Sequence, residues 1–384
     1  MKKIFNFFQI IPNFKIVYPI YFLLSFLPYA ILLLHFKVDK PDLIDHIKFA
    51  DGLSTAEHFP VHPLFFVAIK ILSLFSTQYF WKLFAGFLIF SSSQFLTYYF
   101  SARIIKEVFK CDMNILMHFL LISLQFAIPI PIFSKFLMTE TISMNYFHNG
   151  TMSMSIPFAF GLVLYFFKFL EDENILFLKY AYYISVFLVL TKPSFTFCFI
   201  PAVPIYAYLK YGFSTRLLRT LQLSIFLTFC IVGQSFYLRH YTPSYLKSFS
   251  LKFQPFYLHG TILNHLRIVF EGYLIGLLFF VFYFKAIIKE KKLFFCFCMV
   301  FIGYTLSFTM IDYLNGTIFP NMIWQTPIVN KLSIVFILPF FSLVNKKMFD
   351  YKQIILSLCL FIHGICGLYY LYYVCLLRLF FLSM

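Results

Sequence analysis

Long runs of apolar residues recur along all 384 residues of the chain, and they restrict its fold more than any other feature. A helix needs roughly 20 apolar residues to cross the hydrocarbon core of a bilayer. Apolar residues make up 61% of the sequence and charged residues only 12%, which excludes an ordinary soluble domain. We therefore predict an all-α fold, a polytopic transmembrane helix bundle that forms one domain over residues 1–384.

The apolar runs predict about 11 spans. They lie near residues 16–36, 79–101, 114–133, 152–170, 178–192, 194–211, 219–238, 267–288, 292–312, 329–345 and 353–375. A further run at 63–76 is too short for an ordinary span. It fits a short span or a re-entrant or interfacial helix.

The basic residues decide between these readings of 63–76. If that segment does not cross, more of the lysines and arginines fall in the cytoplasmic loops than outside, as the positive-inside tendency requires. We therefore predict a multi-pass protein of the cell (inner or plasma) membrane, with a cytoplasmic N-terminus and an extracytoplasmic C-terminus. The basic residues behind the net charge of +16 lie in short loops that set orientation, so this charge does not indicate nucleic-acid binding.

Four longer segments fall on the predicted outer face, at 37–62, 134–151, 239–266 and 313–328. The first of them concentrates acids and histidines. From Pro41 onward its apolar residues recur with helical spacing, so we predict an interfacial helix. Asp42, Asp45 and His46 fall on the other face of this helix. One carboxylate could act as a general base supported by the histidine, or the face could simply be solvated.

The first outer segment ends at His62, before Pro63. Because proline is tolerated in the first turn of a helix, we expect a helix to begin at Pro63, with His62 at its boundary. His46, His58 and His62 with the aspartates could bind a divalent cation, but their spacing matches no specific metal site, and we assign no metal ligands.

The remaining candidates for substrate binding lie in or beside the later outer segments. Glu140, His148 and Asn149 cluster just before a predicted span. Lys192 precedes Pro193 between two apolar runs, where it could snorkel to the surface or bind the phosphate of a lipid-linked donor.

The third outer segment holds further cations of the same kind. They are Arg239, His240, His265 and Arg267. Glu271 lies four residues after Arg267, at a spacing that suits an ion pair on a helix.

Several short motifs in this order resemble multi-span proteins of bacterial surface-polysaccharide loci. They are Asp42…His46, His62-Pro63-Leu64-Phe65, His148-Asn149-Gly150-Thr151…Pro157-Phe158, Lys192-Pro193-Ser194-Phe195 and a late asparagine-containing turn before the last spans. The overall plan is similar to that of the GT-C glycosyltransferases, which carry a catalytic acid in the first extracytoplasmic loop.

This resemblance implies a transferase that uses a polyprenyl-phosphate- or polyprenyl-diphosphate-linked sugar as donor and a glycan or lipid-linked acceptor. Asp42, or Asp45 as second choice, would deprotonate the acceptor hydroxyl. Lys192 with Arg239 or Arg267 would hold the leaving phosphate.

Three other functions remain open. An O-antigen or capsule polymerase would use Arg239, His240, His265 and Arg267 in place of Asp42. A transporter or flippase of a lipid-linked sugar should show internal repeats and polar residues at mid-membrane depth. The sequence shows no repeat. A surface acyltransferase would use His46 or His62 as its base.

Overall fold

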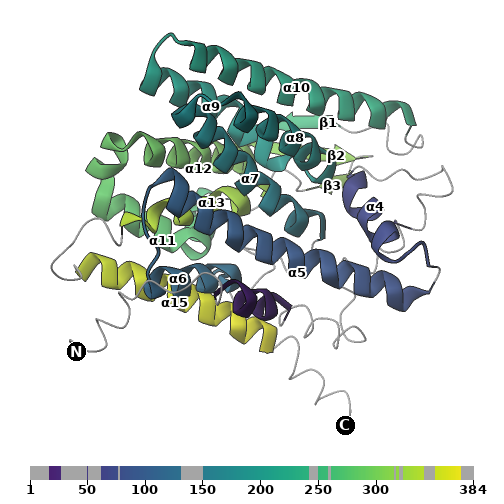
Figure 1. The fold of residues 1–384 in the computed structure, drawn as a ribbon, viewed down its shortest axis with the longest axis horizontal. Helices are drawn as coiled ribbons and strands as arrows, with labels where there is room; N and C mark the ends of the chain where they lie inside the picture. The colour runs from purple at the N-terminus through teal and green to yellow at the C-terminus, as the bar shows by residue number, and fades with distance from the viewer. Residues whose placement is uncertain are drawn as a thin grey trace.

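The computed structural model is mostly helical, with 86% of the residues that it describes in helices. It describes residues 17–26, 50, 62–76, 78–130, 150–241, 250–257, 261–314, 317–319, 323–340 and 351–372. The helices pack side by side into one bundle, with α10 along one edge and α15 along another (Figure 1). This confirms the predicted helical bundle.

The helices follow one another along the chain. After Val17–Phe26 they are α4 (Pro63–Leu72), α5 (Tyr79–Arg103), η1 (Ile104–Val108), α6 (Ile115–Phe126), α7 (Gly150–Asp172), α8 (Ile175–Thr191), α9 (Ser194–Tyr211), α10 (Thr215–Tyr241), α11 (Ile262–Lys289), α12 (Lys291–Thr309), α13 (Gln325–Ile337) and α15 (Tyr351–Tyr372). Several begin at a polar side chain that accepts a backbone hydrogen bond, as Asn114 does from Met117 N at 3.0 Å and Asn174 from Leu176 N at 2.9 Å. Such caps explain why these helices start where they do.

Six helices among the described residues are long and apolar enough to cross a membrane. They are Tyr79–Val108, Gly150–Asp172, Thr215–Tyr237, Ile262–Lys289, Lys291–Thr309 and Tyr351–Tyr369. Val17–Phe26, α6 and α8 are apolar but shorter. Membrane-crossing helices are therefore supported by length and composition, whereas the number 11 stays a prediction.

The helix α4 begins at Pro63 as predicted, with His62 at the N-cap position. Its ten residues rise by about 15 Å, roughly half the thickness of a hydrocarbon core. Phe65, Phe66 and Ile69 are buried in one apolar cluster with residues of α5. The Phe65 ring also fills the space beside Gly150 at the start of α7.

Charged residues from four inter-helix connections meet at one end of the bundle, which we name the basic end. Glu107 contacts Arg103 at 2.5 Å and Lys168 at 2.6 Å. Glu171 contacts Lys292 at 2.6 Å. Two further pairs join the same end: Lys110 with Glu171, and Arg216 with Glu173. The predicted cytoplasmic loops near 103–110, 168–179, 210–219 and 285–292 therefore lie together.

A small antiparallel sheet lies at the opposite end, which we name the strand end. It consists of β1 (Ser250–Phe253), β2 (Met310–Leu314) and β3 (Thr317–Phe319), in the order β1-β2-β3. Figure 1 shows α4 at the same end. The sequence did not predict this sheet. The strands lie in or overlap two of the predicted outer segments, 239–266 and 313–328. By pairing, they give each other's backbone N–H and C=O groups hydrogen-bond partners outside the helices.

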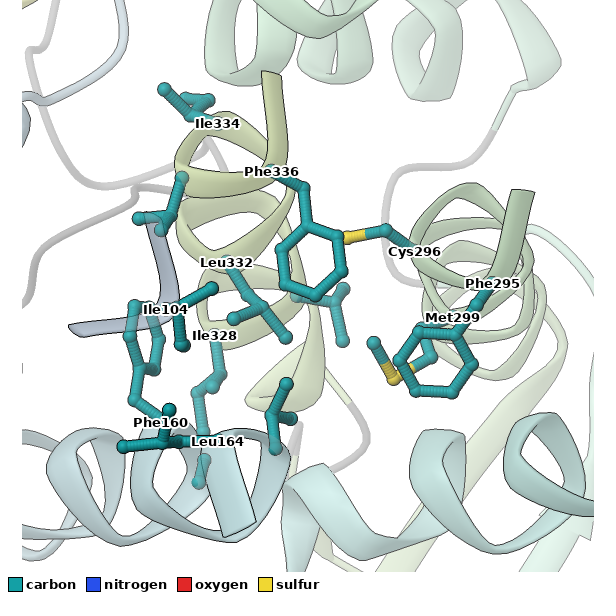
Figure 2. Packing of buried hydrophobic residues seen from close by; sticks show 14 of the residues in the cluster. Ile104, Phe160, Leu164, Phe295, Cys296, Met299, Ile328, Leu332, Ile334 and Phe336 are labelled. Atoms are coloured by element: carbon teal, nitrogen blue, oxygen red, sulfur yellow. The ribbon is translucent and has the colours of Figure 1, made fainter. Parts of the chain in front are cut away.

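The helix α13 lies at the centre of the bundle, and all 13 of its residues are buried. Figure 2 shows Ile328 and Leu332 near Ile104 and the α7 side chains Phe160 and Leu164. On another side Phe336 faces Cys296 of α12 (Figure 2). The span predicted at 329–345 is thus a short interior helix in its described part, beginning at Gln325.

Candidate functional site

The strand end gathers most of the predicted binding residues that the structure describes. The helices α8 and α10 run toward it from the basic end, and α9, α11 and α13 begin there. These helix ends therefore lie on one side of the bundle. We take this end as the candidate functional site.

Lys192 is the most unusual of these residues, because its charged side chain is only 5% exposed. It ends α8 in an extended conformation, and Pro193 directly after it is the N-cap of α9. Its ammonium nitrogen lies 4.1 Å from the centroid of the Trp324 ring. A desolvated cation over an indole face is a favourable arrangement, worth about 2 kcal/mol.

Trp324 precedes α13, and the polar residues of this helix extend from the strand end into the interior of the bundle. The Gln325 amide donates to Gly303 O and to Ser307 Oγ, both at 3.3 Å. Asn330 donates to the Tyr304 hydroxyl at 2.8 Å. These bonds tie α13 to α12 and give the amide nitrogens of two buried side chains their acceptors.

Three buried residues of α13 were not among the predicted binding residues. Gln325 and Asn330 are fully buried, and Lys331 is 2% exposed. The sequence does indicate a polar face on this helix, because Thr326, Asn330 and Ser333 recur at the spacing of one helix face. A buried lysine in a largely apolar bundle is a functional candidate in its own right.

His265 and Arg267 lie in the first turns of α11, which begins at Ile262. His265 is 1% exposed, and its ring packs edge-on against Phe256 and Phe308. Its Nδ1 lies 2.7 Å from Thr261 O. Because a carbonyl oxygen only accepts, Nδ1 carries the proton, and Nε2 is the acceptor nitrogen of the neutral ring.

Arg267 pairs with Glu271, as the spacing predicted. The Arg267 Nε atom lies 3.6 Å from a carboxylate oxygen of Glu271, whose side chain is fully buried. The arginine side chain is 32% exposed. Arg267 thus balances the charge of the buried Glu271 carboxylate, while part of the arginine side chain remains exposed.

Two further predicted residues lie at the same end. His62 precedes α4, whose Phe65 packs against Gly150 at the start of α7. The backbone of Arg239 lies in the last turn of α10, which extends to Tyr241. The structure thus brings Lys192, His265 and Arg267 to one end with these two positions.

The other predicted residues lie outside the described residues. They are the catalytic candidates Asp42, Asp45 and His46 and the binding candidates Glu140, His148 and Asn149. Ala50 of the acidic segment is described, and it is buried in the cluster that contains Phe65 and Phe66 of α4. Among the described residues no group of three or more histidine, cysteine or acidic side chains could hold a metal ion.

Comparison of the sequence with protein-family models finds no matching family, and comparison with curated proteins finds no significant match.

Proposed function

We propose that the protein is an integral-membrane glycosyltransferase. It transfers a sugar from a polyprenyl-phosphate or polyprenyl-diphosphate carrier to a glycan or lipid-linked acceptor, at the strand end. This end faces the extracytoplasmic side, and the basic end faces the cytoplasm. The basic end carries the cations that the positive-inside tendency places there.

The observation that carries the proposal is the buried ammonium group of Lys192. An ionisable side chain inside a membrane bundle is rare and often marks a substrate or ion pathway. It stands at a break between α8 and α9, and such interruptions are tolerated where they line a cavity or are covered by protein. A phosphate at this break would form a charge-assisted hydrogen bond with Lys192.

The base for the acceptor hydroxyl is assigned to Asp42, with Asp45 as second choice and His46 in support. Ala50 packs into the cluster around α4 at the strand end. In the sequence, Asp42 precedes Ala50 by eight residues.

A polymerase of lipid-linked repeat units is the second candidate, and His265 favours it. The Nδ1 bond to Thr261 O makes Nε2 the acceptor nitrogen, which is the arrangement a general base requires. Arg267 two residues later supplies a cation. In this enzyme, His265 and Arg267 would replace the aspartates in the chemical step.

A complementation assay separates the two candidates. The variants Asp42→Asn, Asp45→Asn and Arg267→Ala would be expressed in cells that lack the native gene, and their membrane levels matched. We expect Asp42→Asn to lose surface glycan and to accumulate an unelongated lipid-linked acceptor. Full activity in both aspartate variants, with single repeat units accumulating in Arg267→Ala, would contradict the glycosyltransferase and support the polymerase.

A further inference from the structure

A second group of buried polar residues lies apart from the strand-end site, where α6 stops inside the bundle. The helix α6 ends at Phe126, short of the span predicted to residue 133. Residues 127–130 continue without helical structure. Ile128 N donates to His363 O of α15 at 3.2 Å, and Ile130 N donates to Glu271 O of α11 at 3.2 Å.

Polar side chains from α5 and α15 reach the backbone of this break. The Gln94 amide donates from Nε2 to Gln125 O at 3.2 Å. The His363 Nδ1 atom lies 2.6 Å from Ile128 O. Gln94 lies near the middle of α5 and His363 near the middle of α15, so the break lies at mid-depth in the bundle.

Three of these buried side chains, and Ser91 one turn before Gln94 on α5, keep acceptor atoms without a hydrogen-bond partner among the described residues. They are Ser91 Oγ, Gln94 Oε1, Gln125 Oε1 and His363 Nε2. The Gln125 side chain is fully buried, and neither of its amide atoms makes a hydrogen bond within the described part of the chain. The bond from His363 Nδ1 to a carbonyl leaves Nε2 as the acceptor of the neutral ring.

A ligand that satisfies these acceptor atoms must be a hydrogen-bond donor or a cation. A helix C-terminus carries partial negative charge, and its last carbonyl groups lack helical partners. The acceptors are neutral amide, hydroxyl and imidazole groups, whereas a divalent cation is usually bound through carboxylates. Close packing excludes a large molecule, because a Cβ added to Gly367 of α15 would lie only 1.6 Å from Phe126 O.

We propose that the break at the end of α6 binds a monovalent metal cation. Gln94 and Gln125 supply side-chain oxygens, and the last turn of α6 supplies backbone carbonyls. Ser91 completes the polar surroundings, and His363 holds residues 127–130 in place. Interrupted helices use unwound carbonyls in this way to coordinate monovalent ions in membrane transport proteins.

The test measures thermal unfolding of the full-length protein in detergent, in sodium, potassium or choline chloride at equal ionic strength. We expect sodium or potassium to raise the Tm by about 3–6 °C over choline at roughly 100 times the Kd. Gln125→Leu should abolish this shift. In choline alone, Gln125→Leu should be as stable as the native protein or more stable, because it removes a buried amide that has no hydrogen bond among the described residues.

Gln353→Leu provides the matched control. Gln353 is also a buried glutamine. It lies in the first turn of α15, away from the α6 break, and its amide donates to Phe340 O. It should lose some stability in every salt and keep the sodium or potassium shift. The proposal is overturned if neither ion raises the Tm over choline, or if the shift persists in Gln125→Leu.

Discussion

Replacing Lys192 with methionine is expected to lower sugar transfer by about 100-fold or more, while the protein still inserts and folds. Methionine keeps much of the length and apolar volume of lysine, so packing against Trp324 is largely preserved. The ammonium group is lost, and with it the charge that stabilises the leaving phosphate. Rates would be measured with purified protein at matched concentrations.

Two variants control this experiment. Lys179 lies on the same helix, α8, but its side chain is exposed, so Lys179→Met should keep full activity. Lys192→Arg retains the charge in a different shape and should keep part of the activity. Native activity in Lys192→Met would show that Lys192 only stabilises the end of α8.

Replacing Gly367 with alanine is expected to destabilise the bundle by about 1–3 kcal/mol. The added Cβ would lie 1.6 Å from the carbonyl oxygen of Phe126, which is backbone and cannot rotate away. The α15 helix must then move away from α6. The expected result is a clear fall in Tm, measured by thermal unfolding in detergent micelles.

Gly233→Ala is the matched control, because Gly233 also lies inside a helix but has no atom within 4 Å of an added Cβ. Alanine there should be neutral or stabilise by up to about 1 kcal/mol. Equal Tm values for the two alanine variants would refute the close approach of α15 to α6.

The helical architecture was predictable because the apolar runs are long and the breaks between them are chemically marked. Pro63 starts α4, and Lys192 with Pro193 separates α8 from α9, as predicted. The ion pairs at the basic end join connections that the order of the predicted spans places on one side. The helix boundaries depend on local sequence, so they can be read from the chain directly.

The arrangement of the helices inside the bundle could not be predicted, and the reason is physical. Where nearly every residue of a helix is apolar, periodicity cannot show which face is buried or how deeply the helix lies. The central position of α13 and the early end of α6 therefore emerged only from the structure. The same holds for the sheet, whose strands pair segments distant in sequence.

The candidate site was predictable in part. Lys192, His265 and Arg267 stood out because charged and titratable groups are rare in this chain, and the structure brings them to one end. Asn330 and Lys331 were missed because they fall in the apolar run at 329–345, which suggested an ordinary span, and Gln325 because it falls in the predicted outer segment 313–328. Their importance depends on burial, which is a tertiary property.

The most direct test of the glycosyltransferase proposal follows the fate of a radiolabelled polyprenyl-linked sugar in proteoliposomes that contain the purified protein and an acceptor. We expect the label to move into a new glycosidic bond while polyprenyl phosphate or diphosphate is released, and Lys192→Met to abolish both. If the intact lipid-linked sugar instead crosses to the other leaflet with no bond formed, the protein is a flippase and not a glycosyltransferase.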